Sequence, residues 1–338
     1  MTSAPKAGIV VVGSLNADLT IYCQRLPQPG ETVHGNGFAV NPGGKSANQA
    51  VAASRLGAQV TLIGVVGDDS NGTMLLDSTA GAGVDVSRVR RADVATGVAV
   101  ISVDADGENS IIISAGANGT LMPADIRPDA FEGAAVVCLC LEVGIETVIA
   151  AAQAGHDAGA TVLLNLSPYA EVPERLATLS NVLLVNAHEA AMFLGSGVDV
   201  PDADAGVEAW EPVRRQFAAR GLQQVLITLG AHGSVVVDSL AGDGQTGEGQ
   251  TGEGQSGAVQ SGAAEGRITR IAPTKVSAVD TTGAGDAFTG AVAARLAAGE
   301  SLADAAAFAS VAAALAATKK GTQAAYPGIA DVEELRGA

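Results

Sequence analysis

The sequence predicts an α/β protein in which helices cover both faces of a doubly wound, mostly parallel sheet, with a small β-sheet lid added to it. Short apolar runs alternate with stretches of helical pattern along most of the chain, which is typical of a buried parallel sheet. Two segments break this alternation and are typical of paired strands. The 338 residues, 47% of them hydrophobic, can form one large domain or two ordinary ones, and we expect a single domain over residues 1–338.

The apolar runs expected to form the main sheet are short and are bounded by Gly, Asp or Asn. The expected strands are Ile9–Val12, Val60–Val66, Ala135–Leu141, Thr161–Leu166, Val182–Val185 and Val225–Leu229. The helical stretches include Lys45–Leu56, Ile145–Ala158, Val207–Ala219 and Thr289–Ala298. This order of strands and helices is the basis for the predicted parallel sheet.

The strand pairs that interrupt the alternation are Ala17–Cys23 with Glu31–Val40, and Gly97–Asp104 with Glu108–Ser114. The second pair is joined through Asp106-Gly107, a dipeptide favoured in tight hairpins. We expect these strands, within residues 17–40 and 97–114, to form a lid over a site at the edge of the main sheet. The alternative is that they are ordinary hairpins that extend the main sheet.

Residues Leu240–Gly266 are expected to form a flexible, low-complexity surface loop between two strands. The segment Gly244–Ala258 reads GQTGEGQTGEGQSGA, a pentapeptide in tandem that offers no residue to a core. Surface loops tolerate such expansions, so no catalytic role is assigned to this segment.

The chain is strongly acidic, with 36 Asp and Glu residues against 19 Lys and Arg residues and a net charge of −17. This charge repels nucleic acid and anionic lipid, and no basic cluster offsets it, so neither is expected as a partner. The apolar run near the start is too short for a secretory signal, and Ala134–Leu141 and Ser301–Ala317 are too short to span a bilayer. We therefore expect a soluble, cytoplasmic protein.

The three cysteines, Cys23, Cys138 and Cys140, form neither a paired framework nor a C-x-x-C motif. Cys138 and Cys140 alternate along an expected buried strand, where a thiol usually serves as a small hydrophobic group. No metal or redox chemistry is expected at these residues.

The stretch Asn41–Ala50, NPGGKSANQA, contains the Gly-Lys-Ser that ends a phosphate-binding loop of the Walker type. The complete pattern needs a glycine five residues before Gly44, so that backbone N–H groups can wrap a pyrophosphate. That position is Ala39, and Lys45 therefore needs a different role.

The segment Val279–Phe288, VDTTGAGDAF, carries a sharper signal. Gly283 and Gly285 let the backbone approach a ligand closely, and the N–H groups at the start of the following helix form an anion site. Such a site suits a transferring phosphoryl group. A dinucleotide fingerprint is excluded, because its third glycine position holds Phe288.

Asp286 lies in the first turn of that helix and has two interpretations. It can be a plain capping residue, or it can take the proton from a hydroxyl that attacks the bound phosphate. The second is favoured, because Asp280 and Asp286 flank a glycine turn.

Three separated stretches resemble the ribokinase branch of the PfkB carbohydrate kinases. They are Gly13–Asp18 (GSLNAD), Gly43–Asn48 (GGKSAN) and Asp280–Asp286 (DTTGAGD), and the likeness runs from about Ile9 to Pro327. The resemblance implies a ribokinase-like kinase domain with its lid, and transfer of the γ-phosphate of ATP to the 5-hydroxyl of D-ribose. It also implies that Lys45 belongs to the sugar site.

The resemblance implies which residues touch the sugar. They would be Asn16, Asp18, Gly44, Lys45, Ser46, Ala47, Asn48 and Glu142, with Asp286 as the general base. The amides of Gly283, Ala284 and Gly285 would hold the developing charge. Amides and carboxylates suit a sugar, because a diol both donates and accepts hydrogen bonds. Taken without the motifs, Glu142 would either cap a strand or face solvent.

The resemblance also implies that Asn186 and Glu189 organise Mg²⁺ and the phosphates of ATP. Taken alone, the same pair is a capping box for a helix over Ala187–Leu194, and both interpretations can hold together. His188, between them, is left out because a lone histidine is more often structural. Other implied contacts of ATP are Thr228, Leu229, Gly230, Ala231, His232, Gly233, Gly285 and Ser310.

A monovalent cation, usually K⁺, is the last implied component, and it would stiffen the anion site. Its ligands would be Asp280 and Thr282 with backbone oxygens of Ala316, Lys319, Gly321 and Ala325. Two residues depart from the family pattern. Ser46 stands where a glycine is common and is expected to add a hydroxyl near the sugar, and Ala325 replaces a hydroxylic residue.

Alternatives to ribose phosphorylation remain open. One is a kinase of the same family for another small sugar or nucleoside, such as deoxyribose or adenosine, and another is a sugar- or nucleotide-binding regulator without turnover. The combination of Asn16 and Asp18 with Lys45 and Asn48 favours ribose, and an intact Asp286 argues against a regulator. An oxidoreductase is disfavoured by the missing fingerprint. A homodimer is expected if two lids pair edge to edge, as exposed strands tend to do.

Overall fold

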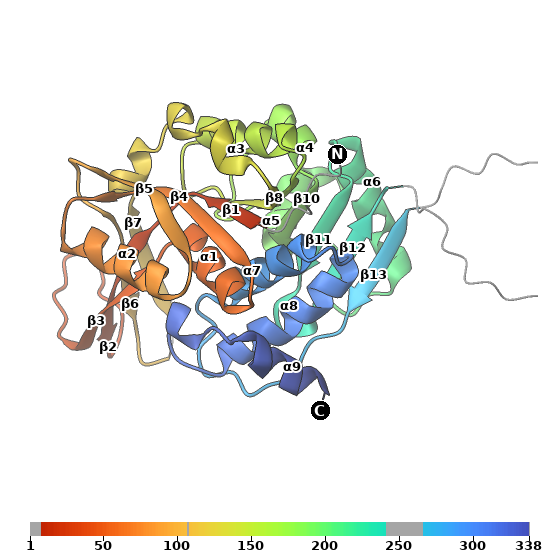
Figure 1. Ribbon diagram of the computed structural model, residues 1–338. Coiled ribbons are helices and arrows are strands. Elements are labelled where there is room, and N and C mark those ends of the chain that lie inside the picture. Colours follow the sequence, from red (N-terminus) through yellow and green to blue (C-terminus); the bar gives the residue numbers. More distant parts are fainter. Residues whose placement is uncertain (1–7, 107, 241–265, 338) are drawn as a thin grey trace, which may run out of the picture.

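The computed structural model describes residues 8–106, 108–240 and 266–337. Its main feature is a nine-stranded sheet of order β13-β12-β11-β10-β9-β8-β1-β4-β5 (Figure 1). Neighbouring strands are parallel except where β12 pairs with β11 and β13. The strands are β1 (Gly8–Val12), β4 (Gln59–Gly67), β5 (Asp85–Ala92), β8 (Ala134–Leu139), β9 (Thr161–Asn165), β10 (Val182–Asn186), β11 (Gln224–Thr228), β12 (Ser234–Asp238) and β13 (Arg267–Ile271). The predicted mostly parallel sheet is confirmed.

Helices cover both faces of this sheet (Figure 1). They are α1 (Lys45–Arg55), α2 (Ser70–Gly81), α3 (Ile145–Asp157), α4 (Glu174–Leu179), α5 (Ala187–Leu194), α6 (Glu211–Ala219), α7 (Ala284–Ala297), α8 (Leu302–Ala317) and α9 (Ile329–Gly337). Ile9 and Val11 of β1 belong to an apolar cluster with α1, α7 and α8, whereas Val10 and Val12 belong to a cluster with α3, α5 and α6. Because both faces are buried, the strand is a continuous apolar run.

No helix within the described ranges is long and apolar enough to cross a membrane. The tandem repeat predicted to be a flexible loop lies outside the described residues, which include only Leu240 and Gly266 of that stretch.

Several element boundaries differ from the sequence prediction. The helix expected from Thr289 begins five residues earlier, at Ala284, so Asp286 lies in its first turn. The stretch Val207–Ala219 is a 3₁₀ turn, Val207–Trp210, followed by α6. Strand β5, with sequence DVSRVRRA, was not predicted, because an edge strand rich in arginine has neither an apolar run nor a clean alternation.

The lid is a separate four-stranded sheet of order β3-β2-β6-β7. Its strands are β2 (Asn16–Cys23), β3 (Gly35–Gly43), β6 (Gly97–Val103) and β7 (Asn109–Ser114). Two antiparallel hairpins join through the parallel pair β2–β6. The lid prediction is confirmed, and the alternative of hairpins that extend the main sheet is wrong.

The turn between β6 and β7 is held by one aspartate. The Asp104 carboxylate accepts the N–H groups of Asp106 at 3.0 Å and of Glu108 at 2.9 Å, whereas Gly107 lies outside the described residues.

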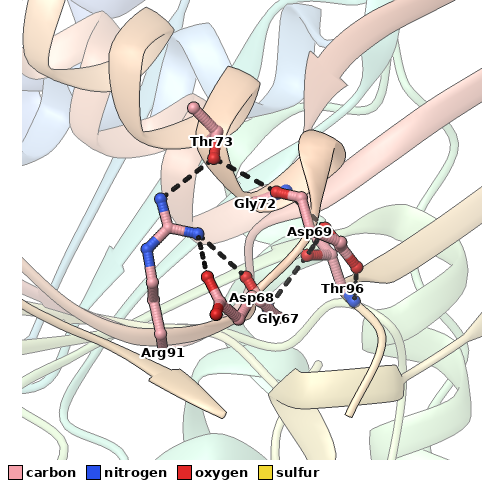
Figure 2. A network of polar contacts seen from close by, with 7 residues as sticks. All are labelled: Gly67, Asp68, Asp69, Gly72, Thr73, Arg91 and Thr96. Carbon is pink, nitrogen blue, oxygen red and sulfur yellow. Dashed lines mark hydrogen bonds and ion pairs between the residues drawn. The ribbon is translucent and has the colours of Figure 1, made fainter. Parts of the chain in front are cut away.

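Asp69 connects the start of α2 to Thr96, the residue before lid strand β6, as Figure 2 shows. Asp69 caps α2 by accepting the Gly72 N–H at 2.8 Å. It also accepts the Thr96 N–H at 2.8 Å and the Thr96 hydroxyl at 2.7 Å. Thr96 directly precedes β6, so this carboxylate fixes where the lid leaves the main domain.

Candidate active site

The candidate active site is a pocket of about 160 Å³ where the carboxyl ends of parallel strands meet the first turns of α1 and α7. Its lining residues are Lys45, Asn165, Ser167, Leu184, Asn186, Glu189, Thr228, Gly283, Gly285 and Asp286. Asn165, Asn186 and Thr228 end β9, β10 and β11, so parallel pairing places them along one edge. Two larger hollows, of about 370 and 790 Å³, contain none of the predicted site residues.

Asp286 is buried at the start of α7, with an exposed fraction of 8%. Its Oδ2 accepts the amide N–H of Asn48 at 3.0 Å, and its Oδ1 accepts that of Gln49 at 3.0 Å. Burial raises the pKa of Asp286 above the usual range, while the Lys45 charge and the two amide donors counteract that shift. These donors favour the ionised form, which is the form a general base needs.

Lys45 is the first residue of α1 and lies in the pocket between carboxylates. Burial by itself lowers the pKa of Lys45, but the surrounding negative groups, of which Asp286 and Glu142 contribute most, together raise it, so the side chain is a cation. Glu142 is half-buried and does not face solvent freely. Its Oε2 accepts the Ser14 hydroxyl at 2.5 Å and the backbone N–H of Lys45 at 3.0 Å.

Asn16 and Asp18 come from the first lid strand, β2. The Asn16 Oδ1 accepts the Asn118 side-chain amide at 2.8 Å, and Asn118 is itself held by the N–H and carbonyl groups of Leu15, each at 3.0 Å. Burial, followed by the nearby Glu142 and Asp286 carboxylates, raises the pKa of Asp18 to about 7. The lid therefore brings Asp18 into the same cluster of charges as the pocket residues.

The two glycines before Lys45 allow the loop to pass directly beside β2. A Cβ on Gly43 would lie 2.1 Å from the Asp18 Oδ2, and a Cβ on Gly44 would lie 2.7 Å from the Asn16 backbone nitrogen. Gly44 also has a φ of +90°, which side chains rarely tolerate. Larger residues at these positions would push the lid strand away from the site.

Ser46 and Ala47 point into the core and are not among the lining residues. The fully buried Ser46 hydroxyl bonds the Val12 carbonyl at 3.5 Å and contacts the Cys140 Sγ at 3.1 Å. Ala47 is fully buried, and its N–H donates to the Ser14 carbonyl at 3.1 Å. The expectation that Ser46 adds a hydroxyl near the sugar finds no support in this geometry.

The segment predicted to bind an anion lies at the start of α7. Gly283 and Gly285 line the pocket, and a Cβ on Gly285 would meet no atom within 4 Å, so a ligand can approach the backbone at Gly285. The N–H of Ala284 already donates to the Thr281 carbonyl at 3.1 Å. On the other side, a Cβ on Gly283 would lie 2.8 Å from the Tyr326 hydroxyl.

Asn186 and Glu189 form the capping box of α5. The Glu189 N–H donates to the Asn186 Oδ1 at 2.8 Å, and the Asn186 N–H donates to the Glu189 Oε2 at 2.9 Å. Both side chains also line the pocket, so the structural and functional interpretations are compatible.

The predicted nucleotide turn connects β11 to β12. Thr228 lines the pocket, and its hydroxyl donates to the Val185 carbonyl at 3.4 Å. Gly230–His232 form a 3₁₀ turn that is exposed and lies beyond the lining residues. The Leu229 N–H donates to the Gly233 carbonyl at 2.8 Å and closes the turn.

Ser310, on α8, is not among the lining residues either. Its hydroxyl accepts the Thr274 N–H at 3.2 Å and donates to the Ala272 carbonyl at 3.3 Å. A Cβ on Gly233 would lie 2.2 Å from the Ile271 carbonyl oxygen, so this segment packs against the nucleotide turn. Ser310 thus holds the segment Ala272–Thr274, which packs against the turn Thr228–Gly233.

The predicted cation ligands come from two segments that the structure joins. Asp280 accepts the N–H groups of Thr282 at 2.9 Å and Gly321 at 3.0 Å. Burial raises the pKa of Asp280, but these hydrogen bonds outweigh it and the pKa is lowered, so the carboxylate is ionised.

The backbone oxygens predicted as cation ligands lie in the second of these segments. The Ala316 carbonyl accepts the Lys319 N–H at 3.3 Å, and Ala325 is buried in a 3₁₀ turn. Within the described ranges no group of three or more His, Cys, Asp or Glu side chains could hold a metal ion. A cation here would therefore depend on the single Asp280 carboxylate together with carbonyl and hydroxyl oxygens.

Four residues of the site were not predicted from the sequence: Gln49, Asn118, Asn165 and Gln323. Asn165 ends a predicted strand as Asn186 does, and Gln49 follows Lys45 by one helical turn, so strand ends and helix spacing could have indicated both. No local signal marks Asn118 or Gln323.

An α/β sheet with a lid, a glycine turn before a helix and a buried carboxylate in the first turn of that helix are typical of phosphoryl-transferring enzymes. The pattern of the pfkB family carbohydrate kinases matches residues 6–328, and the chain belongs to this family. It is a kinase that transfers a phosphoryl group to an alcohol group of a carbohydrate.

The chain is similar to several characterised proteins over nearly its whole length. It is 34% identical to a ribokinase of Schizosaccharomyces pombe over 96% of each chain, and 31% identical to a deoxyribokinase of Salmonella typhi over 96% of this chain and 97% of that protein. The solved structure of Arabidopsis thaliana ribokinase, complexed with ribose and ATP, superimposes with a TM-score of 0.81 at 30% identity. That match covers 97% of this chain and 98% of the other.

Proposed function

We propose that this protein phosphorylates D-ribose at its 5-hydroxyl with ATP, giving ribose 5-phosphate and ADP. The observation that carries the proposal is the buried Asp286 carboxylate, which lies in the first turn of α7 and in one pocket with Lys45, Asn186 and Glu189. The similarity to ribokinases supports ribose as the acceptor.

In this proposal the sugar lies under the lid. Asn16, Asp18, Gly44, Lys45, Asn48 and Glu142 bind its hydroxyls, whereas Ser46 and Ala47 shape the loop from the core. Asn118 keeps the Asn16 amide in one orientation. The lid excludes water, which would otherwise compete with the sugar for ATP.

Asp286 acts as the base in the transfer step. One of its carboxylate oxygens takes the proton of the 5-hydroxyl as the sugar oxygen forms a bond to the γ-phosphorus, and the bond from that phosphorus to the ADP oxygen breaks. The N–H groups at the start of α7 stabilise the negative charge on the transferring phosphoryl group. Lys45 balances the carboxylates around the acceptor.

ATP lies along the turn Thr228–Gly233, with Ser310 supporting that turn. Asn186 and Glu189 would hold Mg²⁺ and its waters, and Mg²⁺ supplies charge neutralisation at the phosphates. Asp280 and Thr282 with carbonyls of 316–325 would hold K⁺, and the ionised Asp280 fits this role. We include a cytoplasmic location and a homodimer formed through the lid in the proposal.

The test is release of ADP from ATP and Mg²⁺ with D-ribose, 2-deoxyribose, fructose and adenosine offered separately, with and without K⁺. Turnover is expected on ribose, and Asp286→Asn is expected to lower kcat by at least about 100-fold, the usual effect of losing a general base. ATP binding by the variant, measured by calorimetry, serves as the control for folding.

Other outcomes of this assay would change the proposal. Faster turnover on 2-deoxyribose would leave the proposed mechanism unchanged and would make 2-deoxyribose the preferred acceptor, in line with the similarity to a deoxyribokinase. ATP binding without turnover on any acceptor would favour the regulator.

A further inference from the structure

The carboxylate of Asp286 is connected to a buried thiol through one glutamine. Gln49 Nε2 donates to Asp286 Oδ1 at 3.0 Å, and Gln49 Oε1 accepts the Cys138 S–H at 3.3 Å. The exposed fraction is 1% for Gln49 and 1% for Cys138. The three residues come from α7, α1 and β8, so only the packed domain assembles this chain of contacts.

The two ends of a glutamine amide have nearly the same shape, but one donates and the other accepts hydrogen bonds. An ionised carboxylate only accepts, so Asp286 requires the Nε2 end of Gln49. Burial raises the pKa of Cys138 well above its usual range, so the thiol stays neutral and offers its S–H. The thiol therefore favours the Oε1 end, and both contacts select the same orientation of the amide.

Asn48 is held in a parallel way but belongs to the proposed sugar site. Its Nδ2 donates to Asp286 Oδ2 at 3.0 Å, and its Oδ1 accepts the Gln323 side-chain amide at 3.0 Å. Neither residue is among those that line the pocket. Gln49 differs because it is not part of the proposed sugar site, and the two ends of its amide contact Asp286 and Cys138, so we expect it to affect the reaction only through Asp286.

We propose that Gln49 is a positioning residue for Asp286, and that the Cys138 thiol fixes which end of the Gln49 amide faces the carboxylate. This inference rests on the proposed function, in which Asp286 accepts the proton of the sugar hydroxyl. Gln49 holds the base in one rotamer and keeps it ionised at the pH where it works.

Other charged and titratable groups also face Asp286. They are Lys45 of α1, Asp18 of β2, Glu142 after β8, Cys138 of β8 and Tyr326 after the last 3₁₀ turn. Lys45 lowers the pKa of Asp286 and Glu142 raises it. The Gln49 donor lowers it, so its loss raises the pKa of Asp286. A base works when it is ionised, so kcat falls as the pH falls through the pKa of the base. This low-pH side of the plot of kcat against pH is called the acid limb, and a raised pKa moves it to higher pH.

The first variant is Gln49→Met, which keeps the length of the side chain and removes the donor. The acid limb of kcat is expected to move up by about one pH unit, since a hydrogen bond to a charged group has roughly that effect on a pKa. The KM for the sugar is expected to change by less than about threefold, because Gln49 does not line the pocket. An acid limb that does not move would overturn the proposal.

The thiol is tested by a matched set of variants on one segment. Cys138→Ala is expected to move the acid limb in the same direction by roughly half a unit, and Cys138→Ser, which restores a donor, is expected to return it to the wild-type position. Cys140→Ala removes a second buried thiol that contacts Ser46 instead, and it is expected to leave the limb in place. Equal shifts for Cys138→Ala and Cys140→Ala would show a general packing effect and contradict the role of Cys138.

A measurement without turnover separates this inference from the proposed function. In protein labelled with ¹³C at the aspartate carboxyl carbon, the signal lost in Asp286→Asn identifies Asp286, and its pH titration is followed without ATP or sugar. The midpoint is expected to rise in Gln49→Met and in Cys138→Ala. If the wild type does not phosphorylate ribose, the proposed function fails, whereas an unchanged midpoint in both variants overturns the role of Gln49. If Gln49→Met does not fold, the Cys138 variants decide.

Discussion

Asp18, on lid strand β2, lies near the charges of Glu142, Asp286 and Lys45, and these surroundings determine its own charge. Burial and two neighbouring carboxylates raise its pKa to about 7 in the folded protein, whereas an unfolded aspartate titrates near 4. Between these values the folded state binds a proton that the unfolded state has released. The contribution of Asp18 to the free energy of unfolding is therefore fully present below about pH 4 and is lost as the pH rises to about 7.

Asp18→Asn removes this titration. Its free energy of unfolding is expected to match the wild type near pH 4 and to exceed it by about 1–3 kcal/mol at pH 8, as measured by urea denaturation. Asp129→Asn is a control of opposite sign, because hydrogen bonding to Arg88 lowers the pKa of Asp129 and stabilises the folded state at neutral pH. Identical pH profiles for the wild type and Asp18→Asn would contradict the raised pKa.

At the scale of elements, the Asp69 carboxylate holds both the start of α2 and Thr96, the residue before lid strand β6 (Figure 2). Thr96 is 3% exposed, and its hydroxyl also accepts the Gly67 N–H at 2.9 Å. Without Asp69, the N–H groups of Gly72 and Thr96 would each lose their acceptor. Loss of a helix cap and a buried N–H group left without an acceptor each destabilise a folded protein, and both would follow from this substitution.

Asp69→Ala is expected to lower the free energy of unfolding by about 2–3 kcal/mol and to increase amide hydrogen exchange in β6 and β7. Asp68→Ala is the matched control, because its side chain is 79% exposed and contacts only Arg91, at 3.5 Å, among the pairs in Figure 2. That variant is expected to change stability by less than about 0.5 kcal/mol. Equal losses in the two variants would mean that Asp69 does not anchor the lid.

At the scale of the whole molecule, the lid has one face towards the site and one face away from it. Asp18 pairs with Asn41 and Ala99, and the next row of the sheet joins Val40, Leu19, Val100 and Ile112, which therefore point to the opposite face. Phe38 and Ile21 belong to that outer face as well, and Phe38 is 64% and Ile112 71% exposed. An exposed apolar face of this kind is typical of an interface between proteins, which supports the proposed lid-to-lid dimer.

Ile112→Lys is expected to convert a dimer to a monomer, as measured by analytical ultracentrifugation, because a charge would be buried in the apolar interface. Ile111→Lys is the matched control, since Ile111 is 51% exposed on the other face of the same strand. A monomeric wild type, or a dimer broken by Ile111→Lys alone, would exclude an interface on the outer face.

Much of the fold was predictable because it depends on local pattern. The sheet strands are buried on both faces, so they read as apolar runs, and the lid strands lack helices between them. The capping box of α5 and the glycine turn before α7 are also local, so Asn186, Glu189 and Asp286 could be placed from sequence. The edge strand β5 was not predicted, because the charged residues typical of a sheet edge interrupt its apolar pattern.

The sequence by itself determined the fold class, the lid and the three motifs, because hydrophobic period and glycine positions act over a few residues. Two of these motifs, Gly43–Asn48 and Asp280–Asp286, contribute residues to the pocket lining. Only the tertiary structure decided the surroundings of the base. The Asp286 carboxylate meets Gln49 across 237 residues and Asn48 meets Gln323 across 275, while the Ser46 hydroxyl points into the core. Such contacts depend on how helices pack on a sheet, and that packing determines the hydrogen bonds and the pKa of each carboxylate.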